Sequence, residues 1–354
     1  MLTEEAVRHA LSGVEDPELK KPLTDLGMVK YVKIDNHNVE VGITLTVPGC
    51  PLKARISDDV SNAVKSINGV QSVSIIFDVM TDEQRSRLKE KLGMGGRAAG
   101  KTASIVSCAK RFIAVSSGKG GVGKSTVTAN LAVALARLGK RVGLLDADVY
   151  GFSIPHMLGI TGEPTIIDNK MVPLRRGNNL QVVSMGFFVK EDEPVIWRGP
   201  LLHKAIQQFI NDVVWDDLDY LFLDLPPGTG DVTLTIAQSI PSTELLVVTT
   251  PQATATHVAG RVAKLAERTN LKVVGVVENM AYYESNGHRD YIFGKDGGKN
   301  LARRLGVELI GEIPLLTSIR EGADEGRPVA DQGSEQEVAL FETIARRLEA
   351  TARR

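Results

Sequence analysis

One stretch of the sequence has the residue types and spacing that bind phosphate groups. Residues 118–125 (G-K-G-G-V-G-K-S) fit the phosphate-loop pattern G-x-x-x-x-G-K-[ST]. Glycines allow the backbone to direct its N–H groups at phosphates, and the N-terminus of a following helix adds partial positive charge. We expect Lys124 to reach the β- and γ-phosphates of a nucleotide, and the Ser125 hydroxyl to bind Mg²⁺. The candidate nucleotide-binding residues of this loop are Gly118, Lys119, Gly120, Gly121, Val122, Gly123, Lys124, Ser125 and Thr126.

A glycine-rich turn that binds no ligand is the alternative interpretation of this stretch. The flanking sequence argues against it, because residues 112–116 form an apolar run typical of a short buried strand. From Lys124 to about Leu138, apolar residues recur with the period of a helix. Strand, glycine-rich loop and helix therefore follow one another in the order that a phosphate loop requires.

Carboxylates follow two other apolar runs. Asp146 and Asp148 come at the end of the run 141–146, and Asp224 ends the run 220–224. Two carboxylates beside a phosphate loop can hold Mg²⁺-bound water or orient an attacking water, although Asp146 could simply form the turn. An acidic residue directly after an apolar strand fits the Walker B position, which holds Mg²⁺ through water, and we expect Asp224 to have this role.

Cysteine chemistry in the chain is limited to Cys50 and Cys108. Pro51 suits the first position of the helix that we expect next, so Cys50 lies near the N-terminus of that helix. The helix dipole and nearby N–H groups would favour a thiolate there, which makes Cys50 a candidate ligand or nucleophile. A small buried cysteine that fills the turn is an equally good interpretation. We interpret Cys108 as structural, or simply exposed.

Strand and helix patterns predict how these residues are positioned. Residues 1–82 predict a small α/β domain, in which Thr3 caps the first helix and three strands and a second helix follow. Residues 83–110 are rich in Lys, Arg and Gly, which is typical of a basic, flexible linker. Residues 111–354 alternate between strand and helix, which predicts an α/β domain with a doubly wound, mostly parallel sheet. The strands expected in that domain are 112–116, 141–146, 180–184, 220–224, 244–250, 273–277 and 308–313.

The C-terminal stretch predicts a final helix. Ser334 and Glu337 have the spacing of a capping box, and Leu340, Phe341, Ile344 and Leu348 fall on one face. We expect this face to pack on the sheet. Docking of the helix on a membrane is the alternative, and acidic residues dilute its basic face.

Composition narrows the functional classes. The 354 residues carry a formal net charge of −1, which gives no overall attraction to nucleic acid or to an anionic membrane. No apolar run approaches the ~18 residues of a membrane-spanning helix, and the N-terminus lacks the features of a signal peptide. Two cysteines favour a reducing compartment. We therefore expect a cytoplasmic protein with neither nucleic acid nor membrane as a partner.

The phosphate-loop string resembles one family of P-loop ATPases. Residues 119–126 are similar to the deviant Walker A motif K-G-G-x-G-K-[ST] of MinD/ParA-like ATPases. The resemblance implies that Lys119 reaches the nucleotide of a partner subunit in a homodimer, and that Lys119, Lys124 and Asp148 are catalytic, with Asp148 positioning the hydrolytic water. It also implies that Asn279 binds the adenine edge. An amide that donates and accepts suits adenine, although Asn279 could be a simple turn residue.

Three further strings resemble one branch of that family and a small domain of iron–sulfur assembly proteins. Residues 224–231 (D-L-P-P-G-T-G-D) look like the second switch of the Mrp/ApbC iron–sulfur cluster carrier ATPases. Residues 16–18 (D-P-E) and 46–51 (T-V-P-G-C-P) resemble a small domain of iron–sulfur assembly proteins, in which the cysteine is functional. The resemblance implies a homodimeric, Mg²⁺-dependent ATPase that binds ATP and an iron–sulfur cluster and transfers the cluster to apo-proteins. It makes Cys50 the candidate cluster ligand.

One departure from the family leaves other functions open. Many Mrp-type carriers have Cys-x-x-Cys soon after the Glu-Asn-Met that occupies 278–280 here, whereas residues 281–291 contain no cysteine. Clusters usually bind four thiolates, and a dimer of this chain has two copies each of Cys50 and Cys108. His288 could substitute, although an isolated loop histidine is more often solvated. The alternative is an ATP-switched dimeric adaptor that binds no cluster; a positioning ATPase on membrane or nucleoid would leave residues 1–82 unexplained.

Overall fold

The computed structural model describes residues 2–17, 21–45, 53–81, 84, 108–148, 151–167, 170–188, 206, 208–228, 231–269 and 271–353. The chain divides into two compact units. The first consists of Met1–Thr102 with Thr165–Val172, and the second of Ala103–Pro164 with Pro173–Arg354. Most of the linker predicted at 83–110 lies outside the described residues, so the three-part division stays a prediction.

The first unit is built on a three-stranded sheet with β2 in the middle. β1 runs antiparallel to β2, and β3 runs parallel to it. The elements of this unit are α1 (Glu4–Leu11), β1 (Val29–Asp35), β2 (Asn38–Leu45), α2 (Lys53–Lys65), β3 (Ser72–Val79), β6 (Thr165–Ile167) and β7 (Lys170–Val172).

Local sequence explains the helices and the turn of this unit. Thr3 caps α1, since its hydroxyl accepts a hydrogen bond from the backbone of Ala6, as predicted. Between β1 and β2, Asn36 has a left-handed backbone with φ of 55°, which Asn tolerates better than most residues. The buried residues of α2 are Ile56, Val60 and Val64, spaced four apart on one face. The helical pattern predicted for this stretch is therefore confirmed.

A short hairpin from later in the chain completes the core of the first unit. β6 and β7 pair antiparallel, and Ile167 of β6 is buried in the same cluster as residues of α1, β2 and α2. The sequence patterns did not predict this hairpin. Its strands have three residues each, too few to show the alternation of a strand.

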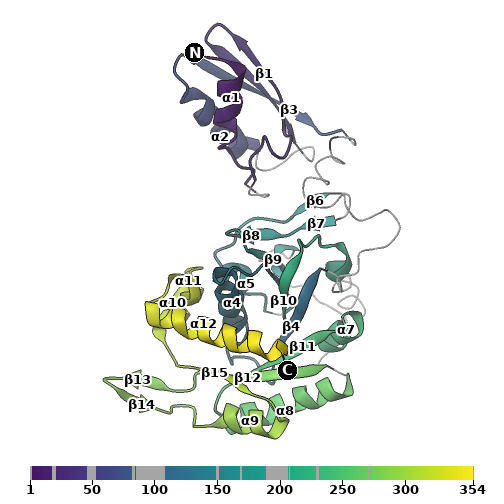
Figure 1. The fold of residues 1–354 in the computed structure, drawn as a ribbon, viewed down its shortest axis with the longest axis vertical. Coiled ribbons are helices and arrows are strands. Elements are labelled where there is room, and N and C mark those ends of the chain that lie inside the picture. The colour runs from purple at the N-terminus through teal and green to yellow at the C-terminus, as the bar shows by residue number, and fades with distance from the viewer. Residues whose placement is uncertain are drawn as a thin grey trace. The chain divides into compact units, whose positions relative to one another are not determined.

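The second unit contains an eight-stranded sheet in the order β15-β12-β11-β4-β10-β5-β9-β8 (Figure 1). Neighbouring strands are parallel except for β8, which is antiparallel to β9 at the edge. The sheet strands are β4 (Ala109–Ser117), β5 (Val142–Asp146), β8 (Leu174–Arg176), β9 (Leu180–Ser184), β10 (Leu218–Asp224), β11 (Thr243–Thr249), β12 (Lys272–Asn279) and β15 (Leu309–Ile313). All seven strands expected in this domain are confirmed, and the α/β class with a mostly parallel sheet is confirmed with them.

Helices cover both faces of this sheet. Figure 1 shows α4 and α12 on one side and α7 and α8 on the other. The helices and 3₁₀ turns of the unit are α4 (Lys124–Arg137), α5 (Ile154–Met157), η2 (Met185–Phe188), α7 (Asp231–Ser239), α8 (Ala253–Arg268), α9 (Gly297–Leu305), α10 (Thr317–Asp324), α11 (Val329–Gln332), α12 (Glu335–Ala350) and η3 (Thr351–Arg353). Among the described helices, none has the length and apolarity needed to cross a membrane.

The final helix packs as predicted. Ser334 and Glu337 form both hydrogen bonds of a capping box at the start of α12. Phe341, Ile344 and Leu348 are buried in the core that α12 shares with α4 and the sheet. The apolar face of the helix is therefore covered by protein in this structure.

A second hairpin lies outside the main sheet. β13 (Tyr283–Ser285) and β14 (His288–Asp290) pair antiparallel, joined by Asn286 and Gly287 with φ of 52° and 75°. Asn-Gly is the preferred pair for such a two-residue hairpin turn. The dipeptide was a usable sequence signal for a hairpin that the strand patterns did not predict.

Candidate nucleotide-binding site

Three neighbouring strands end at the same edge of the large sheet and place the candidate residues there. Asp224 of β10 is in register with Val115 of β4 on one side and with Asp146 of β5 on the other. β4 continues into the glycine-rich loop, and α4 begins at Lys124. The carboxyl ends of parallel strands are where such folds bind ligands.

The loop needs glycine immediately before α4. Gly123 has a φ of 78°, a left-handed conformation that costs other residues about 1–2 kcal/mol. A Cβ at this position would also collide with the side-chain amide of Asn279. Backbone conformation and close packing thus both select glycine here.

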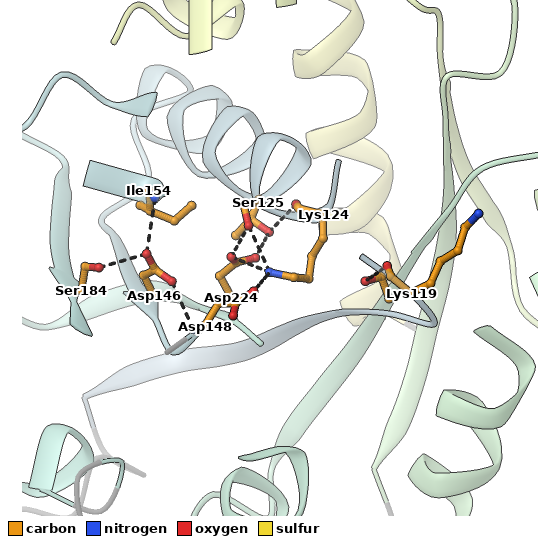
Figure 2. A network of polar contacts seen from close by, with 10 residues as sticks. Lys119, Lys124, Ser125, Asp146, Asp148, Ile154, Ser184 and Asp224 are labelled. Atoms are coloured by element: carbon orange, nitrogen blue, oxygen red, sulfur yellow. Dashed lines mark hydrogen bonds and ion pairs between the residues drawn. The ribbon is translucent and has the colours of Figure 1, made fainter. Parts of the chain in front are cut away.

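Lys124 lies at the centre of a buried polar network (Figure 2). Its Nζ is 2.7 Å from Oδ2 of Asp224, 3.1 Å from Oγ of Ser125 and 3.5 Å from Oδ2 of Asp148. The side chain of Lys124 is only 6% exposed and that of Asp224 is fully buried. The ammonium compensates two carboxylates that would otherwise be costly to bury.

Two hydroxyls complete the surroundings of Asp224. Ser125 donates to Oδ2 over 2.6 Å, and Thr128, one turn further along α4, donates to Oδ1 over 2.8 Å. Both carboxylate oxygens are thus held in a fixed direction. Thr128 was not among the predicted site residues; its spacing of four from Lys124 places it on the same helix face and was the available signal.

Asp146 belongs to a second, adjoining network. Its Oδ2 accepts from the Ser184 hydroxyl at 2.9 Å and from the Ile154 backbone at 3.4 Å, and its Oδ1 accepts from the Asp148 backbone at 3.2 Å. Burial and the charge of Asp224 raise the pKa of the Asp146 carboxyl to about 7, against the opposing effects of the hydrogen bonds from Ser184 and Asp148 and of the Lys124 charge. Ser184, also missed from the sequence, ends β9 in register with Asp146.

A cavity of about 190 Å³ adjoins the network. Loop residues 119–123 line it together with Lys124, Ser125, Thr126 and Asp148. The Lys119 side chain extends away from Asp224 and Lys124 in Figure 2. Its Nζ donates to Oε1 of Gln252 over 2.8 Å.

Asn279 lies beside the loop at the end of β12. Its Nδ2 donates to the carbonyl of Val122 over 2.9 Å, and the residue is 6% exposed. This bond uses one amide hydrogen; the oxygen and the second hydrogen are the groups that a base would contact. The structure thus brings Asn279 to the phosphate loop, while its role towards adenine stays a prediction.

The structure describes one of the two cysteines. Cys50 lies outside the described residues. Cys108, directly before β4, is 6% exposed and therefore buried rather than at the surface. The structural interpretation of Cys108 fits this position, and an exposed one does not.

The donor set fits a nucleotide and Mg²⁺. The Ser125 hydroxyl and the Asp224 carboxylate are adjacent oxygen ligands of the kind that Mg²⁺ prefers. Loop backbone, the N-terminus of α4 and the Lys124 ammonium form an anion-binding cradle around the cavity. A phosphate loop, two acidic strand ends and a mostly parallel sheet define a P-loop nucleotide-binding fold.

Comparisons with known proteins agree with this class. Residues 108–349 match the family model described as NUBPL iron-transfer P-loop NTPase, and residues 4–75 match the model described as iron-sulfur cluster assembly protein. The chain is 46% identical over 341 residues to the iron-sulfur cluster carrier protein of Mycobacterium leprae, which covers 94% of this chain and 89% of that protein.

Solved structures of similar fold cover about two thirds of this chain. A nucleotide-binding protein from Archaeoglobus fulgidus, in complex with ADP, is 40% identical with a TM-score of 0.57, covering 64% of this chain and 92% of that one. The cell division ATPase MinD of Pyrococcus furiosus is 25% identical with a TM-score of 0.51, covering 68% and 98%. This chain belongs to the family of NUBPL-type iron-transfer P-loop NTPases, and an iron–sulfur assembly domain precedes its NTPase part. The resemblance found in its motifs is confirmed.

Proposed function

We propose that this chain is an ATP-hydrolysing, homodimeric carrier that binds an iron–sulfur cluster and transfers it to apo-proteins. The observation that carries the ATPase part is the convergence of Lys124, Ser125, Asp148 and Asp224 beside the phosphate-loop cavity. The cluster part is supported by the family and by the name of the relative from Mycobacterium leprae. A cytoplasmic setting suits this task, because cluster-binding thiols stay reduced there.

The residues divide the ATPase task between them. Lys124 exchanges its carboxylate partners for the β- and γ-phosphates, and Ser125 and Asp224 would hold Mg²⁺. Mg²⁺ supplies neutralisation of the phosphate charge when bound. Asp148 orients the attacking water, and Asn279 contacts the base. Lys119, whose side chain extends away from Lys124 and Asp224 and donates to Gln252, acts at the nucleotide of the second subunit.

The cluster is cargo, and Cys50 is its candidate ligand. Cys108 is buried at the start of the second unit, which suits a structural role better than a shared cluster. The decisive experiment is anaerobic reconstitution of the full chain, followed by iron and acid-labile sulfide per chain. We expect Cys50→Ser to lose both and Cys108→Ser, the matched control, to keep them. Bound iron that survives Cys50→Ser would contradict the assignment.

Hydrolysis is tested separately with Lys124→Ala. We expect wild-type protein to release phosphate from ATP, and the variant to release none above background. Undiminished turnover in Lys124→Ala would refute the site.

One observation favours the adaptor as a second candidate. Where many carriers have the cysteine pair, this chain has the β13–β14 hairpin, with Tyr283 41% exposed and Tyr291 just beyond it 39% exposed. Exposed aromatic side chains are typical of protein contacts. Intact ATPase activity with no bound iron in the reconstituted wild-type protein would favour the adaptor over the carrier.

A further inference from the structure

One carboxylate holds both ends of the segment that connects Asp148 to α5. Asp146 accepts a hydrogen bond from the backbone N–H of Asp148 at 3.2 Å and from that of Ile154 at 3.4 Å. Ile154 is the first residue of α5. The conformation of this segment at both ends therefore depends on where the Asp146 carboxylate points.

Ser184 sets the direction of that carboxylate. Its hydroxyl accepts from the backbone N–H of Gly186 at 3.0 Å and donates to Asp146 at 2.9 Å. A hydroxyl has a single hydrogen to donate, and here it is directed at Asp146. Ser184 is fully buried and belongs to β9, so the sheet itself fixes its position.

The two residues lie behind the nucleotide cavity rather than in it. Among the described residues that line the cavity, Asp148 is present and neither Asp146 nor Ser184 is. Figure 2 shows Ser184 on the side of Asp146 away from Lys124. Burying a carboxylate costs free energy, and an apolar side chain at this position would avoid that cost. The three directed hydrogen bonds of Asp146 therefore indicate a role in placing the segment.

We propose that Ser184 and Asp146 are positioning residues for hydrolysis, which hold Asp148 in place beside the phosphate loop. The inference rests on the proposed ATPase function and extends it to two residues that are not among the described residues lining the cavity. Asp148 is 3.5 Å from the Lys124 ammonium in this arrangement. Removing the Ser184 hydroxyl frees the carboxylate to turn, and Asp148, whose backbone N–H donates to that carboxylate, moves with it.

The test compares Ser184→Ala, Ser184→Thr and Thr351→Ala with the wild-type chain. Thr351 is the matched control, because it also has a buried, hydrogen-bonded hydroxyl but lies at the end of α12. Steady-state kcat and KM for ATP, ADP affinity and melting temperature are measured for each. Since misplacing a reacting group by about 1 Å can cost about 100-fold, we expect Ser184→Ala to lower kcat by at least about tenfold.

The pattern across variants decides the outcome. We expect ADP affinity of Ser184→Ala to stay within about twofold of wild type, a change of ~0.4 kcal/mol, and Ser184→Thr to keep most of kcat because it keeps the hydroxyl. Thr351→Ala lowers the melting temperature and leaves kcat unchanged. Wild-type kcat in Ser184→Ala overturns the inference. So does an equal loss of kcat and ADP affinity, and so does a Thr variant as slow as the Ala variant.

Amide hydrogen exchange separates this inference from the proposed function. Peptides that span residues 147–156 are followed in the ADP-bound full chain. Faster exchange there in Ser184→Ala, but not in Thr351→Ala, supports the positioning role whether or not the protein hydrolyses ATP. Unchanged exchange contradicts it. Absence of hydrolysis in the wild-type protein would refute the ATPase proposal alone.

Discussion

The Nζ of Lys124 lies 2.7 Å from the fully buried carboxylate of Asp224, so the lysine of the phosphate loop is paired with the acid at the end of β10. The pair joins residues one hundred positions apart in the sequence. Breaking a buried pair by removing one partner typically costs about 3–5 kcal/mol, because the other charge is left uncompensated.

Lys124→Ala is therefore expected to change stability as well as activity. We expect loss of ATP hydrolysis together with a lower free energy of unfolding in the nucleotide-free protein, by roughly 3–5 kcal/mol, measured by denaturant titration. Lys119→Ala is the control, since Lys119 pairs with Gln252 and not with a buried carboxylate. It should keep stability and ADP binding but lose dimerisation on ATP. Equal destabilisation by the two variants would contradict the pairing.

Thr128→Val tests the second hydroxyl on Asp224. The side chain of Thr128 is buried and donates to Oδ1 of the carboxylate over 2.8 Å. Its loss leaves a buried acceptor unsatisfied, so we expect destabilisation of about 1–3 kcal/mol and weaker binding of Mg²⁺-ADP. Thr343→Val is matched, because the Thr343 hydroxyl lies inside a helix beside the carbonyl four residues earlier, as the Thr128 hydroxyl lies 2.9 Å from the Lys124 carbonyl. Thr343 is nevertheless exposed and has no carboxylate contact of this kind among the described residues. If the two variants lose the same stability, the contact with Asp224 contributes nothing.

Asp219 predicts how the protein responds to acid. Burial alone would raise the pKa of the Asp219 carboxyl, but hydrogen bonds from Lys110 and from Arg141 lower this pKa to about 2. A carboxyl with a pKa lower in the folded than in the unfolded chain adds stability above its unfolded value, near 3.8. That contribution is lost as the pH falls from about 4 to about 2.

The measurement is the free energy of unfolding as a function of pH for wild type and Asp219→Asn. We expect the variant to be less stable at pH 7 and the two curves to converge as the pH approaches about 2. Asp217→Asn is the comparison, because Asp217 also pairs with Arg141 at 3.0 Å but its side chain is 73% exposed, so its pair is screened. A constant gap between wild type and Asp219→Asn at all pH values would refute the linkage.

Sequence patterns located the site because its parts are local. The strand before the phosphate loop, the loop and the start of α4 occupy consecutive residues. Asp148 lies two residues after the end of β5, and Asp224 ends β10. Nearly continuous apolar runs mark strands covered on both faces, which is why the seven sheet strands could be predicted. The 3.6-residue period of apolar residues likewise allowed α2 and α12 to be predicted.

The contacts of Asp146 and Lys124 could not be predicted in this way. They depend on register between strands that are far apart in sequence, such as Asp146 of β5 with Ser184 of β9. The three-residue strands β6, β7 and β8 escaped because so short a segment shows no period. The pairing of Lys119 with Gln252 had no sequence signal either, because Gln252 lies in the connection between β11 and α8 and only the fold brings it to Lys119.

Two glycines of the loop allow backbone strain to be separated from packing. Gly121 and Gly123 have φ of 77° and 78°, so alanine at either position is strained by about 1–2 kcal/mol. A Cβ on Gly121 would meet no atom within 4 Å, whereas one on Gly123 would collide with the Asn279 amide. We expect Gly121→Ala to weaken ADP binding modestly and Gly123→Ala to weaken it much more, as measured by calorimetry.

Combining Gly123→Ala with Asn279→Ala tests the close contact between these two residues directly. Truncation of Asn279 removes the amide that the new Cβ would strike. We therefore expect the unfolding free energy of the double variant to lie closer to that of Gly121→Ala than the unfolding free energy of Gly123→Ala does. The coupling between the two sites in this double-mutant cycle should be favourable, about 0.5–3 kcal/mol, as for residues in direct contact. If the changes in unfolding free energy of the two single variants simply add, the loop backbone accommodates the new Cβ without contact with Asn279. The close packing of Gly123 on Asn279 would then contribute nothing to the stability of the phosphate loop.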